Sequence, residues 1–245
     1  MDCKNCGVNF EGNFCPNCGQ KPNSGRLVLR DSLKDITDQW IGIDNPFFQT
    51  MKDLIVRPGK MIKEYIGGKR KSYTQPFRYF IFILAFYLIF RQIMGFNPIE
   101  AFSEMLGSQE LPNPNTASTK GSNYFSKHIN SFMIIFAFTL SGFAKLFNLR
   151  KPMYFVEYLT ASFFVIGQYI VFSIIVILLT QIHPLLFLLN YIIVLIYPSI
   201  VFTQIQTGNL YLRMLKSIFI TVFGWFIYAI IGFSVSTFIV ENFNV

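Results

Sequence analysis

Residues 153–180 read MYFVEYLTASFFVIGQYIVFSIIVILLT, and Glu157 is the one charged side chain in this run. A helix needs about 20 apolar residues to cross about 30 Å of hydrocarbon, so this stretch predicts a transmembrane helix. Four other segments have a similar composition, and they cover residues 77–95, 130–147, 184–203 and 215–240. The sequence therefore predicts an all-α polytopic membrane domain over residues 77–245, with about five transmembrane helices.

The composition of the whole chain agrees with this class. The chain has 245 residues, of which 52% are hydrophobic and only 14% are charged, whereas soluble domains have about 25% charged residues. Eighteen of the 21 Lys and Arg residues lie in residues 1–78, 145–152 and 204–216. Five spans place these three parts on one side, which the positive-inside rule assigns to the cytosol. We expect a multi-pass protein of the cytoplasmic (inner) membrane, with a cytosolic N-terminus and an outer C-terminus.

All the cysteines of the chain lie in its first 18 residues. They form two Cys-x-x-Cys pairs, each followed by a glycine, and the four residues are Cys3, Cys6, Cys15 and Cys18. This spacing predicts a zinc ribbon over residues 1–20 with a structural Zn²⁺ ion. Gly7 and Gly19 are expected to adopt positive φ, and Phe10 and Phe14 are expected to form the small core. Such a small unit must draw most of its folding free energy from the metal.

Other functions of the cysteines fit the sequence less well. Two disulfides are the main alternative, but a cytosolic N-terminus is reducing. A redox site would need a surrounding βαβ pattern, and four thiolates leave no open position for catalytic water. Two basic residues near the cysteines, Lys4 and Lys21, are balanced in charge by Asp2 and Glu11, so the sequence shows no basic face for binding nucleic acid.

Residues 21–76 are predicted to form a linker followed by short amphipathic helices beside the membrane. A helical stripe runs from Leu29 to Trp40, Asn45-Pro46 begins a second helix, and a third runs from Pro58 to Gly67-Gly68. The third helix and the residues after it are strongly basic, which favours anionic lipid head groups or serves only to fix topology. The candidate head-group ligands are Lys60, Lys63, Lys69, Arg70 and Lys71.

Few polar residues lie within the predicted spans, and these are the candidates for intramembrane function. Glu157 is expected either to form a structural ion pair with Lys145, Arg150 or Lys151, or to act as a proton or substrate site. Gln168 and Asn190 are the other candidates, and Asn190 is expected to form an interhelical hydrogen bond. The polar stretch 97–127 is expected to be an outer loop without fixed structure.

Two motifs together resemble a family of bacterial inner-membrane proteins, the domain of unknown function 3667. The first is Cys3-Lys4-Asn5-Cys6-Gly7 with Phe14-Cys15-Pro16-Asn17-Cys18-Gly19-Gln20, and the second is Arg57-Pro58-Gly59-Lys60 with Tyr65-Ile66-x-Gly68-Lys69-Arg70-Lys71-x-Tyr73. The resemblance covers about residues 1–90 and implies architecture without an activity. The family's third span often opens with Glu-His and a later histidine, whereas this chain has Glu157, Tyr158 and Phe164. This difference weakens a metal or catalytic role for that helix.

These observations favour a membrane adaptor or assembly factor that catalyses no reaction. Its expected partners are anionic lipids and a cytosolic protein bound through the zinc ribbon, while nucleic acid is not expected. The sequence leaves the oligomeric state open. The alternative is a transporter or permease for a small molecule or lipid, built on Glu157, Gln168 and Asn190.

Overall fold

The structure is a computed structural model that describes residues 1–20, 45–97, 117–148 and 153–243. The predicted helix from Leu29 to Trp40, its preceding linker, and Arg150 and Lys151 lie outside the described residues.

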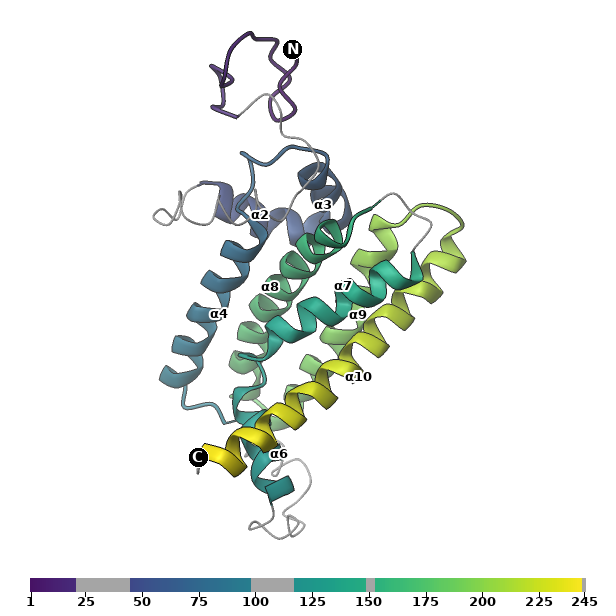
Figure 1. Ribbon diagram of the computed structural model, residues 1–245. Coiled ribbons are helices and arrows are strands. Elements are labelled where there is room, and N and C mark those ends of the chain that lie inside the picture. Colours follow the sequence, from purple (N-terminus) through teal and green to yellow (C-terminus); the bar gives the residue numbers. More distant parts are fainter. Residues whose placement is uncertain (21–44, 98–116, 149–152, 244–245) are drawn as a thin grey trace.

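The described part of the chain is helical apart from the N-terminal cysteine unit, and it contains no named strand. Its elements are α2 (Asn45–Val56), α3 (Pro58–Ile66), α4 (Pro76–Ile93), α6 (Ala117–His128), α7 (Met133–Phe147), α8 (Phe155–Thr180), η1 (Pro184–Leu188), α9 (Leu189–Ile205) and α10 (Leu210–Phe243). Successive long helices run up and down the bundle, so the two ends of the chain lie at opposite ends of it (Figure 1).

Four helical segments are long and apolar enough to cross a membrane, namely α4, α8, η1 with α9, and α10. A fifth crossing exists if α6 and α7 are counted as one broken span, since they meet at an angle of 86°. The predicted all-α fold with about five membrane-spanning helices is therefore confirmed.

The region between α4 and α8 differs from the sequence-based prediction. The segment predicted as a single span at 130–147 contains α7, a helix of only 15 residues. The end of the predicted outer loop 97–127 is helical, because α6 packs Phe125 against α10. A Cβ atom on Gly232 would lie 2.2 Å from the Phe125 ring, so the glycine creates the space for this contact.

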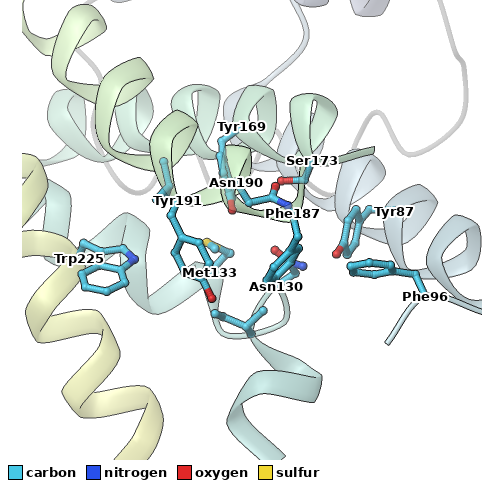
Figure 2. Close-up of a pocket in the computed structure, with 12 residues that line it drawn as sticks. Tyr87, Phe96, Asn130, Met133, Tyr169, Ser173, Phe187, Asn190, Tyr191 and Trp225 are labelled. Carbon is cyan, nitrogen blue, oxygen red and sulfur yellow. The ribbon is translucent and has the colours of Figure 1, made fainter. Parts of the chain in front are cut away.

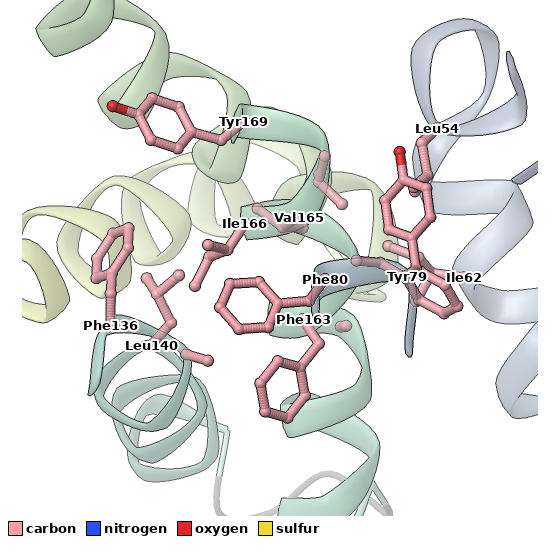
Figure 3. Close-up of a cluster of buried hydrophobic side chains, with 14 of the residues drawn as sticks. Leu54, Ile62, Tyr79, Phe80, Phe136, Leu140, Phe163, Val165, Ile166 and Tyr169 are labelled. Atoms are coloured by element: carbon pink, nitrogen blue, oxygen red, sulfur yellow. The ribbon is translucent and has the colours of Figure 1, made fainter. Parts of the chain in front are cut away.

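Helix α8 forms the centre of the bundle and contacts α4, α7 and α9. Figure 3 shows apolar side chains from α4, α7 and α8, with others from α2 and α3, in one cluster. Phe80 lies next to Phe163 there, at a ring-centroid distance of 5.5 Å. Gly167 lets α4 approach closely, because a Cβ there would lie 2.8 Å from the Tyr79 ring. The long apolar run quoted first is thus the element around which the other helices pack.

Helices α2 and α3 lie at one end of the bundle, across the direction of the long helices (Figure 1). Pro58 begins α3 at a position where a helix needs no N–H donor, and Gly67 caps it as predicted. Two hydrogen bonds join this pair to α9: Tyr197 donates to the Leu54 carbonyl oxygen at 2.9 Å, and the Gly59 N–H donates to Gln204 Oε1 at 2.9 Å.

Candidate metal centre

The four cysteine sulfurs converge on one point in the N-terminal unit. All four Sγ atoms lie within 4.8 Å of one another, with Cys3 and Cys18 at 3.5 Å and Cys6 and Cys15 at 3.5 Å. Tetrahedral coordination with metal–sulfur bonds of about 2.3 Å separates sulfurs by about 3.8 Å. All four cysteines are free, so they are not joined in disulfides. The donor set and its spacing fit a metal ion held by four thiolates.

The two halves of this unit repeat the same backbone geometry. In each half the glycine N–H donates at 2.8 Å to the carbonyl oxygen of the first cysteine, from Gly7 to Cys3 and from Gly19 to Cys15. Gly7 has φ of 79° and Gly19 has φ of 69°, as predicted for these positions. A Cβ at either position would meet no neighbouring atom, so the positive φ is what favours glycine here.

Backbone N–H groups of the knuckles face the sulfur atoms and favour the thiolate form. The N–H of Val8 lowers the pKa of the Cys6 thiol to about 6. The N–H of Cys6 likewise lowers the pKa of Cys3, whereas burial raises the pKa of Cys18 to about 11. The backbone thus prepares part of the donor set for a cation.

The core of the unit is smaller than predicted. Phe10 is 6% exposed and packs against Cys3 and Cys15, as expected. Phe14 is 58% exposed, so the prediction that it forms part of the core is wrong. The metal site and Phe10 supply the interior, which leaves an aromatic side chain on the surface of the unit.

The cysteine unit is hydrogen-bonded to residues 68–72, which lie between α3 and α4. We call these residues the docking loop. Asn5, between the first two cysteines, accepts hydrogen bonds from Ser72 N at 3.0 Å and Ser72 Oγ at 2.9 Å. Gln20 is buried after the last cysteine, and its Nε2 donates to the Gly68 carbonyl oxygen at 2.8 Å. Gln20 Oε1 accepts from the backbone N–H groups of Arg70 at 3.3 Å and Lys71 at 3.2 Å. Each half of the metal unit therefore contributes one side chain to the same loop.

A polar network next to the docking loop holds α2 and α3 together. Arg57 binds Asp53 with two hydrogen bonds, from Nε at 3.1 Å and from NH2 at 2.7 Å. The buried Tyr73 hydroxyl lies 3.0 Å from carboxylate oxygens of both Asp53 and Glu64. Lys69 closes the network with a 3.4 Å ion pair to Glu64.

This network shifts the pKa values of its members. The hydrogen bond from Arg57 lowers the pKa of Asp53, although partial burial opposes that change. Burial, followed by the hydrogen bonds to Glu64 and Asp53, raises the pKa of Tyr73 above its usual value. The carboxylates therefore stay charged near neutral pH and Tyr73 stays a donor.

The five predicted head-group ligands have different surroundings. Lys60, Lys63 and Lys71 are exposed, whereas Lys69 is engaged with Glu64 and Arg70 is half-buried. On the neighbouring helix α2, large apolar side chains are also exposed, namely Phe48, Ile55 and Val56.

The three intramembrane candidates lie in separate places. Glu157 accepts a 2.8 Å hydrogen bond from Tyr154 N at the start of α8, while Lys145 donates to the Met153 carbonyl oxygen at 2.9 Å. Gln168 lies about 16 Å farther along α8 by helical rise and accepts a 2.7 Å hydrogen bond from Tyr79. Asn190 lines a cavity whose lining includes neither Glu157 nor Gln168. The structure thus gives Glu157 a capping contact and brings no two of the three together.

Asn5, Gln20 and the Asp53–Arg57 pair were not singled out as functional residues from the sequence. The i,i+4 spacing of Asp53 and Arg57 is a usable signal for a helical ion pair. For Asn5 and Gln20 the available signal was their position within a cysteine motif.

Residues 44–88 match the family model described as "Protein of unknown function (DUF3667)". This match confirms the resemblance. It covers α2, α3, the docking loop and most of α4, and so includes the polar network. The cysteine unit and the partners of this region in α9, Tyr197 and Gln204, lie outside the matched residues. No curated protein and no solved structure matches the chain.

Proposed function

We propose that this protein is a membrane adaptor or assembly factor that catalyses no reaction, and that its N-terminal unit is a zinc ribbon held as a docking platform on the cytosolic face of the inner membrane. The observation that carries the proposal is the attachment of both halves of the cysteine unit to residues 68–72. A unit fixed at two points presents a surface of constant orientation beside the membrane, which favours recruitment of a partner at low entropic cost.

The platform has a surface suited to a protein partner. Phe14 is exposed on the cysteine unit, and Val8 is 37% exposed on the same unit. Aromatic side chains on a rigid support are typical anchors of protein–protein interfaces. We assign zinc to the site because four thiolates with this spacing select a tetrahedral, redox-inert cation.

The second partner in this proposal is the anionic inner leaflet. The Phe47 ring lies 6.4 Å from Phe82, six residues into α4, so α2 lies level with the start of a membrane-spanning helix. At that depth the exposed apolar residues of α2 enter the edge of the hydrocarbon, and Lys60 and Lys63 meet head groups. The predominance of Lys and Arg in residues 1–78 supports the cytosolic assignment.

The proposal is tested by crosslinking and affinity capture in membranes from cells that express the intact chain or Cys15→Ser. We expect Cys15→Ser to lose zinc and its captured protein while remaining inserted in the membrane. Phe14→Ser provides a second variant, expected to keep zinc and lose the same protein. Capture that survives both substitutions would contradict the platform role, and Asn13→Ala serves as the matched control because it changes an exposed residue of the same unit.

A transporter is the second candidate, and one observation favours it: a cavity within the helical bundle that Asn190 helps to line. In this case Glu157→Gln should leave flux in reconstituted vesicles unchanged, because Glu157 caps α8 outside that cavity. Asn190→Leu should alter flux. Vesicles in which neither the parent chain nor the variant moves any substrate of a broad panel would remove this candidate.

A further inference from the structure

A cavity lies in the half of the bundle farthest from α2 and α3, between α4, α8, α9, α10 and the turn that joins α6 to α7. Six aromatic side chains line it, together with the polar residues Asn130, Ser173 and Asn190. Figure 2 shows Trp225 at one end of this group and Tyr87 with Phe96 at the other, with Asn190 and Ser173 between them.

The polar atoms inside this cavity are not fully satisfied by the protein. Asn190 Oδ1 is buried and makes no hydrogen bond within the described residues, and the buried Ser173 Oγ lies near the Tyr169 side chain without a hydrogen bond of good geometry. Ser173 is 3% exposed and lies on the central helix α8. A buried amide oxygen and a buried hydroxyl without well-formed hydrogen bonds are unfavourable. Their presence in one cavity indicates a guest that supplies hydrogen bonds.

The lining also limits the charge and size of the guest. None of the twelve residues that line the cavity is charged, so an ion would lose its hydration without gaining a counter-charge. The cavity is small: the volume that the centre of a water molecule can occupy inside it is about 40 Å³. One water needs about 10–15 Å³ on the same measure, so the cavity takes about three to four water-sized groups.

We propose that this cavity binds a small neutral polyol group of about three carbons, as in glycerol or the head group of a monoacylglycerol. A hydroxyl both donates and accepts, so neighbouring hydroxyls can donate to Asn190 Oδ1 and exchange a hydrogen bond with Ser173 Oγ. The aromatic walls pack against the C–H groups between those hydroxyls. Most ligand pockets share this combination of an apolar aromatic lining with a few convergent polar groups.

The test uses the intrinsic fluorescence of Trp225, because the chain has only two tryptophans. Trp40→Phe leaves Trp225 as the sole reporter, and it lines the cavity. The full-length variant is placed in lipid nanodiscs and titrated with glycerol, and separately prepared in nanodiscs with increasing monoacylglycerol. We expect a saturable change in Trp225 emission with at least one probe. A response to glycerol identifies a soluble polyol, and a response to monoacylglycerol alone identifies a lipid head group.

Three further variants in the same background separate binding from solvent effects. Asn190→Leu should raise the apparent Kd at least tenfold and Ser173→Ala at least threefold. Ser199→Ala should bind like the parent, because the Ser199 hydroxyl already donates to the Leu195 carbonyl oxygen of its own helix. If neither probe gives a saturable change, or if Ser173→Ala and Asn190→Leu both bind like the parent, the cavity holds only water and the proposal is overturned.

Discussion

Replacing Asn5 and Gln20 by alanine should release the N-terminal cysteine unit from the helical bundle while leaving its four metal-binding thiolates intact. Asn5 makes two hydrogen bonds to Ser72, and Gln20 makes one short and two longer bonds to the docking loop. With about 0.5–1.5 kcal/mol net for each bond, either side chain contributes about 2 kcal/mol, and the pair about 4 kcal/mol. A change of 1.4 kcal/mol is tenfold in an equilibrium constant, so the undocked fraction should rise about 10²–10³-fold.

Amide hydrogen exchange of the zinc-loaded protein in nanodiscs measures this change directly. The Ser72 N–H is bonded to Asn5 and the Lys71 N–H to Gln20, so each amide reports on one contact. Protection of both amides should fall by about 10²-fold or more in the double variant, because exchange follows the opening equilibrium. Each single variant should give an intermediate loss.

The zinc content of every variant is measured alongside, and it should stay at one ion per chain because the four thiolates are untouched. Asn13→Ala is the matched control, since Asn13 is an exposed asparagine of the same ribbon. Ser72 protection that persists in the double variant with zinc still bound would refute the assignment of these two side chains as the attachment.

The other predictions concern the metal, the polar network and the contact between α3 and α9. Removal of zinc with EDTA should raise hydrogen exchange at the Ser72 amide as strongly as the double substitution does, while exchange of amides in α8 stays unchanged. Unaltered exchange at Ser72 would mean that the attachment of the cysteine unit does not depend on the metal. Gly59→Ala should cost about 1–3 kcal/mol through overpacking and lower the thermal midpoint, because the new Cβ would lie 2.2 Å from the Gln204 Cβ; an equal midpoint would mean that Gln204 moves aside freely. The pKa of Asp53 is lowered by Arg57, so its contribution to stability should be complete above the unfolded pKa of about 4 and decline as the pH falls through the lower folded value. Thermal midpoints measured from pH 6 to pH 3 should show this decline in the parent chain, and a parallel decline in Asp53→Asn would contradict it.

Local sequence signals were sufficient where one residue type determines the structure. The run from 153 to 180 predicted α8 because continuous apolar sequence of that length has few alternatives in a membrane. Pro58 and the pair Gly67-Gly68 predicted both ends of α3, since proline and glycine restrict or release the backbone directly. The glycines after the cysteine pairs were predictable for the same reason.

The remaining features depend on contacts between distant segments. Helix α6 is polar in sequence, and its packing comes from Phe125 against Gly232, more than a hundred residues away. The role of Gln20 likewise follows from where the cysteine unit meets residues 68–72. No local pattern encodes such contacts, because tertiary packing decides them after the elements have formed.

Helix α7 has a consequence for the lipid around the protein. Its 15 residues rise about 22 Å, which is about 8 Å less than the hydrocarbon thickness of an ordinary bilayer. The 86° bend at its start turns α6 away from the direction of α7, so a crossing built from both helices is broken between them. Lipids in contact with α7 over its whole length would have to shorten or tilt their acyl chains, at a cost of fractions of a kcal/mol per ångström of mismatch. The mismatch between α7 and the bilayer thus depends on acyl-chain length. Bilayers with shorter acyl chains should surround α7 with less deformation.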